Sequence, residues 1–191
     1  MTASARPLGA DLARIAVFAA LIVVLGTVVV PVPGGVPITA QTLGVMLAGL
    51  VLGARRAPLA ILVVLALAAA GLPVLAGGRG GLGVFVGPSV GYMIGWIAGV
   101  VVIGLIAHGA RFTWWRAGIA ALVGGILVVY LFGIPIQALI TGVPLGPTIL
   151  SSLVFLPGDL IKAVVAVLLA VALRRAYPRA FPAARRVVHA G

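Results

Sequence analysis

The sequence predicts an all-α integral membrane protein, a compact bundle of six transmembrane helices with glycine-rich loops that face outward. Of the 191 residues, 63% are hydrophobic and only 8% are charged, with a mean hydropathy of +1.35. A soluble domain carries about 25% charged residues. The chain also divides into apolar blocks separated by proline, glycine and arginine, and its length suits one membrane domain. It contains no cysteine, which excludes disulfides and thiolate metal sites.

The first predicted span covers about residues 8–30 and ends at PVPGGVP, where proline removes donors and glycine loosens the backbone. Its apolar run, Ile15 to Val30, has 16 residues, and no clear small-residue cleavage site follows it. We therefore expect a retained span and not a signal peptide. The other predicted spans are, in order, 39–53, 58–72, 89–108, 114–141 and 157–176, and residues 177–191 are a basic tail.

With six spans, both ends of the chain lie on the same side of the membrane. Eleven of the 13 basic residues then fall on that side, whereas Arg79 lies on the other side and Lys162 within the membrane. Because basic segments stay inside, we expect a protein of the cytoplasmic (inner) membrane with both termini and the tail in the cytoplasm. Topology and contact with anionic membrane lipid account for the net charge of +11, so no nucleic-acid partner is expected.

One of the two acids and the only lysine stand together in the segment FLPGDLIK. Asp159 and Lys162 are one turn apart on one helical face. Lys162 is about 18 Å along the axis from Arg174, so the pair falls in the outer half of the bilayer if Arg174 marks the cytoplasmic boundary. A charge at mid-membrane costs about 2.5–3.5 kcal/mol on insertion scales. The pair is either a self-satisfied structural ion pair at a helix start or part of a ligand site that faces outward.

Two outward loops favour a ligand site. The stretches PVPGGVPITAQTLG and GGRGGLGVFVGPSVGY bring polar side chains to the same membrane face as the acid–lysine pair, namely Thr39, Gln41, Thr42, Arg79, Ser89 and Tyr92. Apolar walls with a few fixed polar groups are typical of a small-molecule site. The glycine loop also matches GxGxxG, but no strand precedes it and no acid lies about 20 residues further on, so no dinucleotide cofactor is expected.

The sequence gives little support to an enzyme. The two carboxylates, Asp11 and Asp159, lie at opposite sides of the membrane, and neither His108 nor His189 has a metal-ligand spacing. No span carries the polar stripe typical of a channel. We therefore expect neither a catalytic residue nor a metal or other cofactor.

Small residues mark two helix faces. Ala16 and Ala20 lie on one face of the first span, and Gly91, Gly95 and Gly99 lie on one face of the fourth. Such faces allow close contact between helices. Packing inside the bundle is the expected role of the glycines, whereas the alanine face is a candidate contact with a partner subunit.

Three stretches resemble signature regions of the BioY family: PITAQTLGVMLAGLVLGARRAPLA, AGLPVLAGGRGGLGVFVGPSVGYMIGW and FLPGDLIK. They occur in the family's order and spacing, and the similarity extends from about Leu8 to Arg175. The resemblance implies a six-helix subunit of an energy-coupling-factor (ECF) transporter, an S component that captures biotin from outside for uptake. It also implies a transmembrane coupling subunit and two cytoplasmic ATPases as partners, although some members are proposed to act alone.

By this resemblance, the family's ligand-binding positions fall on particular residues of the chain. The matched positions are Asp159, Lys162, Gln41, Thr42, Gly91 and Tyr92, and the face expected to meet the coupling subunit is Ala16 and Ala20. Arg79 is a further candidate because of its place in the glycine loop. The tail after Arg175 carries no motif.

Biotin suits the polar groups that the sequence provides. Asp159 can accept from the ureido N–H groups and Lys162 can donate to the ureido carbonyl, while Tyr92 and apolar side chains pack the rings. Lys162 and Arg79 are both candidates for the carboxylate. A carrier for another small metabolite and a non-transporting membrane scaffold are the alternatives. The sequence also leaves open whether the chain works alone, as a homo-oligomer or with the coupling module.

Overall fold

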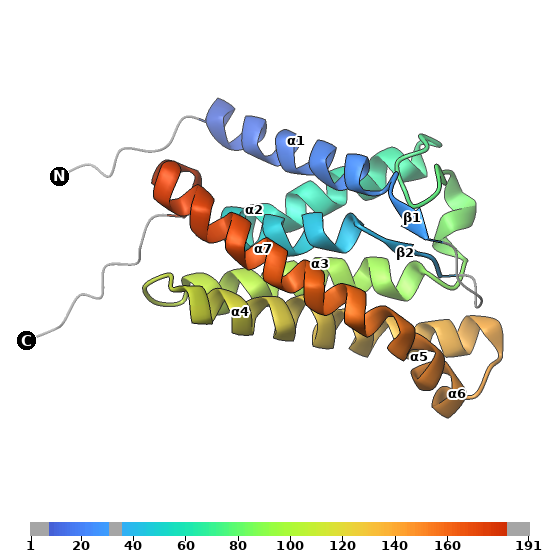
Figure 1. Cartoon of the computed structure of the whole chain (residues 1–191). Helices are drawn as coiled ribbons and strands as arrows, with labels where there is room; N and C mark the ends of the chain where they lie inside the picture. Colours follow the sequence, from blue (N-terminus) through green and yellow to red (C-terminus); the bar gives the residue numbers. More distant parts are fainter. Residues whose placement is uncertain (1–7, 31–35, 183–191) are drawn as a thin grey trace, which may run out of the picture.

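The computed structural model describes residues 8–30 and 36–182, which form a bundle of helices lying side by side (Figure 1). Its helices are α1 (Leu8–Leu25), α2 (Gln41–Ala69), α3 (Val90–His108), α4 (Trp114–Leu122), α5 (Val129–Thr141), α6 (Leu145–Ser152) and α7 (Leu156–Ala176). A π-helical stretch, Val123–Val128, joins α4 to α5, and 3-10 turns occur at Leu82–Phe85, Leu153–Phe155 and Pro178–Ala180. The strands β1 (Val29–Val30) and β2 (Ile38–Thr39) pair antiparallel.

The predicted all-α membrane fold is confirmed, but the described part does not contain six separate long helices. Five helical segments are long and apolar enough to cross a membrane: Leu8–Leu25, Gln41–Ala69, Val90–His108, Trp114–Thr141 and Leu145–Ala176. The predicted spans 39–53 and 58–72 belong to one element, α2. The first helix ends at Leu25, earlier than predicted, because a turn and β1 follow it. Arg6, Arg185, Arg186 and residues 31–35 of the PVPGGVP loop lie outside the described residues.

Helix α2 folds back on itself at Gly53. Gly53 has φ +74° and ψ 177°, a conformation that only glycine adopts readily. Pro58 stands near the start of the second arm, where its missing N–H is tolerated. A straight helix of this length would separate its ends by about 43 Å, yet the Gln41 side chain donates to the carbonyl of Val74, just beyond the end of α2, at 3.1 Å. Both arms therefore meet at one end of the bundle.

Glycines bring α3 against the segment from the π-helical stretch to α5. A Cβ at Gly95 would lie 2.9 Å from the backbone of Val129, and one at Gly91 would lie 2.7 Å from the carbonyl of Phe132. Gly99 meets the carbonyl of Gly124. This is the internal packing expected for the glycine face, and it leaves no room for side chains between the two helices.

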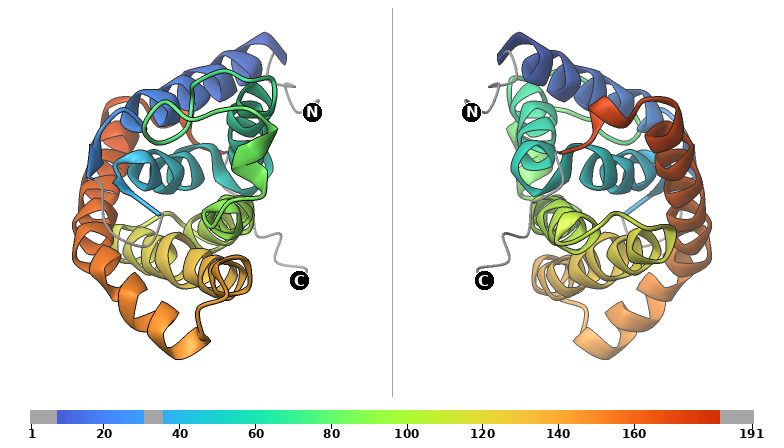
Figure 2. Two further views of the ribbon diagram at one scale, coloured as in Figure 1. Left: turned by 90° about the vertical axis from the view of Figure 1, so that its right-hand side faces the viewer. Right: turned by 90° about the vertical axis from the view of Figure 1, so that its left-hand side faces the viewer.

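Helix α7 has a burial pattern that is the reverse of the one in soluble proteins, where large apolar side chains are buried. Its buried residues are Asp159, Ala163, Ala166 and Ala170, whereas Leu160, Ile161, Val164, Leu168 and Leu169 are exposed. Small residues therefore face the bundle and large apolar ones face outward, as lipid contact requires. In end-on views, α7 and α1 lie at the periphery of the bundle (Figure 2).

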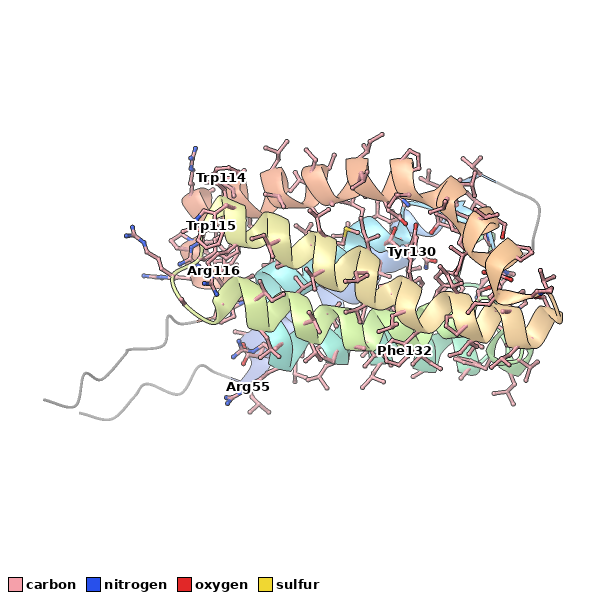
Figure 3. All side chains as sticks on the ribbon, turned by 90° about the horizontal axis from the view of Figure 1, so that it is seen from below. Arg55, Trp114, Trp115, Arg116, Tyr130 and Phe132 are labelled. Atoms are coloured by element: carbon pink, nitrogen blue, oxygen red, sulfur yellow. The ribbon has the colours of Figure 1, made fainter. Side chains whose placement is uncertain are left out.

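The opposite end from the Gln41–Val74 contact is rich in arginine, and we call it the arginine-rich end, defined by Arg14, Arg56, Arg116 and Arg174. Asp11 pairs there with Arg14 at 3.3 Å and with Arg56 at 2.7 Å. Arg55, Trp114, Trp115 and Arg116 all lie at this end, with Arg55 on the other side of the bundle from the two tryptophans (Figure 3).

The chain beyond α7 is not simply the basic tail that the sequence predicts. Phe181 is completely buried, and its ring packs against Phe112 and His108 with centroid distances of 5.4 and 6.3 Å. Pro182 packs against Gly53 at the fold of α2. The start of the predicted tail therefore closes the arginine-rich end, and residues 183–191 lie outside the described part.

Candidate ligand-binding site

A cavity lies at the end of the bundle where α2, α3 and α7 begin, and we call this the cavity end. Side chains from the loops and from α2, α3, α5 and α7 surround it. Its lining residues are Val36, Pro37, Ile38, Thr39, Gln41, Thr42, Leu75, Ala76, Arg79, Ser89, Tyr92, Met93, Trp96, Val129, Tyr130, Phe155, Asp159 and Lys162. Apolar and aromatic groups thus form the walls around a few polar groups, as in small-molecule sites generally.

The buried carboxylate of Asp159 lies at the centre of the polar side chains that line the cavity. Its Oδ1 accepts from Lys162 Nζ at 2.9 Å and from Thr42 Oγ at 3.2 Å, and its Oδ2 accepts from Tyr130 Oη at 2.8 Å. Lys162 Nζ also donates to Thr42 Oγ at 3.0 Å. Tyr130 lies between α5 and α7 (Figure 3). Three helices therefore hold one ion pair in place.

This ion pair keeps hydrogen-bonding capacity. An ammonium has three donors, and among the described residues Lys162 uses two of them. A carboxylate has about four lone-pair sites, and Asp159 receives three bonds. The pair therefore has one donor and one acceptor left for a ligand, within a cavity where Asp159 and Lys162 side chains are only 7% and 15% exposed.

Gln41 lies at the start of α2 and is held by the neighbouring loop. Its amide nitrogen donates to Val74 O at 3.1 Å, and Gly26 leaves the space that the side chain fills. Gln41 is 1% exposed, yet it lines the cavity. Its amide thus joins the two ends of the folded α2 at the cavity wall.

Arg79 lies in the loop that the sequence places outside. The backbone of this loop turns back on itself, with Leu75 N donating to Arg79 O at 3.0 Å. The guanidinium of Arg79 donates to Ala76 O at 3.0 Å and to Ser89 Oγ at 3.4 Å. A guanidinium has five donors, so these two bonds leave most of its capacity for a ligand in the cavity.

Tyr92 lines the cavity with its ring, whereas its hydroxyl is hydrogen-bonded to residues outside the cavity lining. Its Oη donates to Gln137 Oε1 at 2.8 Å and lies 3.2 Å from Ser152 Oγ. The ring meets Tyr130 and Phe155 edge to face, both at 6.3 Å. Tyr92 therefore supplies an aromatic surface to the cavity.

The other predicted residues lie outside the cavity. Gly91 does not line it but faces α5, where the backbone of Gly133 and the carbonyl of Phe132 are in contact range. Ala16 and Ala20 are exposed on α1. They form part of an outward face that also includes Leu12, Val17 and Val24.

Sequence reasoning missed Tyr130, Trp96 and Phe155. Tyr130 and Trp96 stand inside long apolar blocks, where an aromatic residue gives no distinct signal. Phe155 opens the segment FLPGDLIK and lines the cavity, but beside the acid and the lysine it is one more apolar residue in an apolar stretch. One available signal was the scarcity of tyrosine, since the chain has only three and two of them line this cavity.

The fold and the cavity define an all-helical membrane protein with a buried ion pair in a cavity near one end, the class to which membrane solute-binding subunits belong. A model of the BioY family matches residues 1–179, and the chain belongs to that family. The family consists of transporter subunits and not enzymes.

Relatives and a solved structure agree with the family. The chain is 49% identical over 178 residues to the biotin transporter BioY of Rhizobium etli, covering 88% of this chain and 95% of the relative. It is 50% identical over 170 residues to that of Rhodobacter capsulatus, covering 82% and 88%. A 2.1 Å crystal structure of the S-component for biotin from an ECF-type ABC transporter matches with a TM-score of 0.83 and 34% identity, covering 90% of this chain and 95% of that one.

Proposed function

We propose that this protein captures biotin in the cavity from the outer face and supports its uptake across the cytoplasmic membrane, as the substrate-binding subunit of an ECF-type transporter. The observation that carries the proposal is the buried pair of Asp159 and Lys162, which retains one acceptor and one donor toward the cavity. The names of the similar biotin transporters and of the matching S-component support the choice of ligand.

The ureido group of biotin matches the pair. It offers N–H donors beside a carbonyl acceptor, so one edge of it can donate to Asp159 and accept from Lys162 at once. Hydrogen bonds to charged groups are worth about 1.5–3 kcal/mol. The rings of Tyr92, Trp96 and Phe155 provide apolar walls for the thiophane ring and the side chain.

We assign the biotin carboxylate to Arg79. Lys162 is already committed to Asp159 and Thr42, so pairing it with a second carboxylate would weaken the buried pair. Arg79 lines the same cavity and has unused donors among the described residues. A guanidinium binds a carboxylate with two parallel hydrogen bonds, which favours Arg79. Gln41 and Thr42 then serve mainly to place the wall and the pair, and Gly91 serves to place Tyr92.

The proposed topology has six membrane spans with both termini in the cytoplasm. The two arms of α2, residues 41–52 and 54–69, are the second and third spans, because the helix reverses at Gly53. Arginines gather at the end opposite the cavity, which the positive-inside rule assigns to the cytoplasm. Since the chain has no cysteine, Leu82→Cys should react with an impermeant thiol reagent from outside, and Ala110→Cys should not. The reverse labelling would overturn this orientation.

A transmembrane coupling subunit and two cytoplasmic ATPases are the proposed partners. Ala16 and Ala20 are exposed among larger apolar residues of α1, which gives a partner helix room for close approach. Replacing both with leucine should weaken co-purification with a coupling subunit while biotin binding stays unchanged. Co-purification at the wild-type level would remove the role of this face. Transport without the coupling module, by one chain or by a homo-oligomer, would show as biotin uptake in cells that lack the coupling subunit.

Calorimetric titration of the purified protein with biotin tests the proposed function directly. Saturable binding with one ligand per chain supports it. The same titration with other small vitamins tests the alternative of a carrier for a different metabolite, and binding of none of them would leave a scaffold whose ion pair is only structural.

A further inference from the structure

Trp96 carries a buried polar group without a partner at the cavity. It lies in α3 and lines the cavity with only 7% of its surface exposed. Its indole N–H is buried and makes no hydrogen bond to any residue that the structure describes. Nearly all buried polar groups in proteins have a partner, so an unpaired one calls for a water or a ligand.

The other polar side chains of the cavity differ from Trp96 in this respect. Each of them is hydrogen-bonded to another described residue: Thr39, Gln41, Thr42, Arg79, Ser89, Tyr92, Tyr130, Asp159 and Lys162. Among the side chains that line the cavity, Trp96 is thus the one whose polar atom is buried with no partner at all in the described part of the chain. Because indole donates and never accepts, its partner must be a hydrogen-bond acceptor.

The position of Trp96 indicates which part of a ligand it meets. Its neighbour Gly95 packs on the backbone of Val129, and the next residue, Tyr130, donates to Asp159. Trp96 therefore lies at the level of α5 that carries the contact with the ion pair. Ser89, which holds Arg79, is about 10 Å away along the α3 axis. The backbone from which the indole enters the cavity is thus level with the ion pair and about two turns of α3 from the residue that holds Arg79.

We propose that the indole N–H of Trp96 donates a hydrogen bond to the ureido carbonyl oxygen of bound biotin, which makes Trp96 a specificity-determining residue. This inference rests on the proposed function. A carbonyl oxygen has two lone pairs, so it accepts from Trp96 and from Lys162 together. The two donors then select a ligand with an acceptor at this point, because a ligand that places a donor there meets two N–H groups.

Three ligands and a matched pair of variants test the assignment. Trp96→Phe keeps an aromatic ring and removes the N–H, while Trp115→Phe makes the same change at a residue that is 49% exposed at the arginine-rich end. Desthiobiotin keeps the ureido carbonyl and lacks the ring sulfur. In 2-iminobiotin a nitrogen that carries hydrogen replaces the carbonyl oxygen.

Trp96→Phe should lower the affinity for biotin and for desthiobiotin by about five- to tenfold, which is the contribution of one neutral hydrogen bond. The same substitution should change the affinity for 2-iminobiotin by less than twofold. Trp115→Phe should leave the affinities for all three ligands unchanged. An equal loss for all three ligands would reduce Trp96 to a packing residue. A loss for biotin but not for desthiobiotin would make the sulfur the acceptor. Either result overturns the assignment.

A second measurement does not depend on the variant's folding. In protein labelled with ¹⁵N-tryptophan, biotin should move the indole N–H signal of Trp96 downfield, while the signals of Trp114 and Trp115 stay in place. An unmoved Trp96 signal in saturated protein would overturn the inference and leave the biotin site intact. Failure of the wild-type protein to bind biotin would overturn the proposed function as well.

Discussion

Lys162 and Arg174 lie on the same helix, about 18 Å apart along its axis, and each is sheltered inside the bundle in a different way. Lys162 pairs with a carboxylate and a hydroxyl. The guanidinium of Arg174 lies over the rings of Phe112 and Phe181, at 5.0 and 5.3 Å from their centroids. One helix thus has a hydrogen-bonded cation at the cavity end and a cation over aromatic rings at the arginine-rich end.

The difference decides where a ligand can be recognised. The carboxylate and hydroxyl around Lys162 can share their hydrogen bonds with an incoming polar group, whereas an aromatic face offers a cation only its π electrons. A second hollow lies at the arginine-rich end beside Gly53, but His108 there is bonded to Leu50 O at 2.8 Å and Arg56 is paired with Asp11. We therefore expect changes at the cavity end to lower biotin affinity, and changes at the arginine-rich end to lower stability alone.

The largest expected effect is on stability, from Phe181→Ala. Removing a completely buried phenylalanine costs about 3–5 kcal/mol, and it also removes the ring under Arg174. Thermal unfolding in detergent should occur at a markedly lower temperature, while the protein that remains folded binds biotin with wild-type affinity. Leu82→Ala, at a residue that is 73% exposed, is the matched control and should unfold like the wild type. Loss of biotin affinity in folded Phe181→Ala would show that the two ends are coupled.

At the ion pair, by contrast, a loss of biotin affinity is expected in addition to a loss of stability. Asp159→Ala and Lys162→Ala should each lower the affinity for biotin by at least tenfold, because each removes a hydrogen bond to a charged group worth about 1.5–3 kcal/mol. Each also leaves its former partner unpaired in a buried site, so stability falls too. Titration of monodisperse variants separates the two effects. Near-native affinity in both would return the pair to a purely structural role.

The acid–lysine pair was visible in the sequence because charge is so rare in this chain. Asp159 and Lys162 stand out in any apolar block. Thr42 follows one loop and Arg79 lies within another, and the spans place both loops on the same side. The structure brings all four to one cavity. Tyr130 could not be found in this way, because it stands inside a long apolar block and no periodicity records its contact with Asp159.

Two further features were hidden for different physical reasons. The reversal at Gly53 depends on a backbone conformation, and glycine in a short apolar block does not reveal its φ angle. The burial of Phe181 was obscured by the arginines around it, since a basic composition predicts a solvated tail. Gly91, a position taken from the family motif, lies in helix packing beside the cavity and not in its lining.

A pair of glycine substitutions sharpens the comparison between the ends. At Gly91 a Cβ would press on the backbone of α5, and at Gly104 it would press on the backbone of Ala54, beside the fold of α2. Overpacking of this kind costs about 1–3 kcal/mol, so Gly91→Ala and Gly104→Ala should both lower the unfolding temperature. Only Gly91→Ala should also lower the affinity for biotin, because it displaces the neighbouring Tyr92. Gly118→Ala, where the space is open, is the control. Unchanged binding in Gly91→Ala would remove Gly91 from the site altogether.

The smallest effect expected is that of Tyr130→Phe, which deletes one hydroxyl at the cavity end. This hydroxyl fixes Oδ2 of Asp159 at 2.8 Å, so without it the carboxylate gains freedom to turn away from the ligand. We expect biotin to bind about three- to tenfold more weakly, with Tyr177→Phe, at a half-exposed residue beyond α7, unchanged. The hydroxyl acts through the carboxylate, so its effect should disappear when the carboxylate is gone. In a double-mutant cycle, adding Tyr130→Phe to Asp159→Ala should therefore change biotin affinity by less than twofold. If the two losses instead simply added, Tyr130 would contact biotin directly, and the ion pair would not be the unit through which this end of the bundle recognises its ligand.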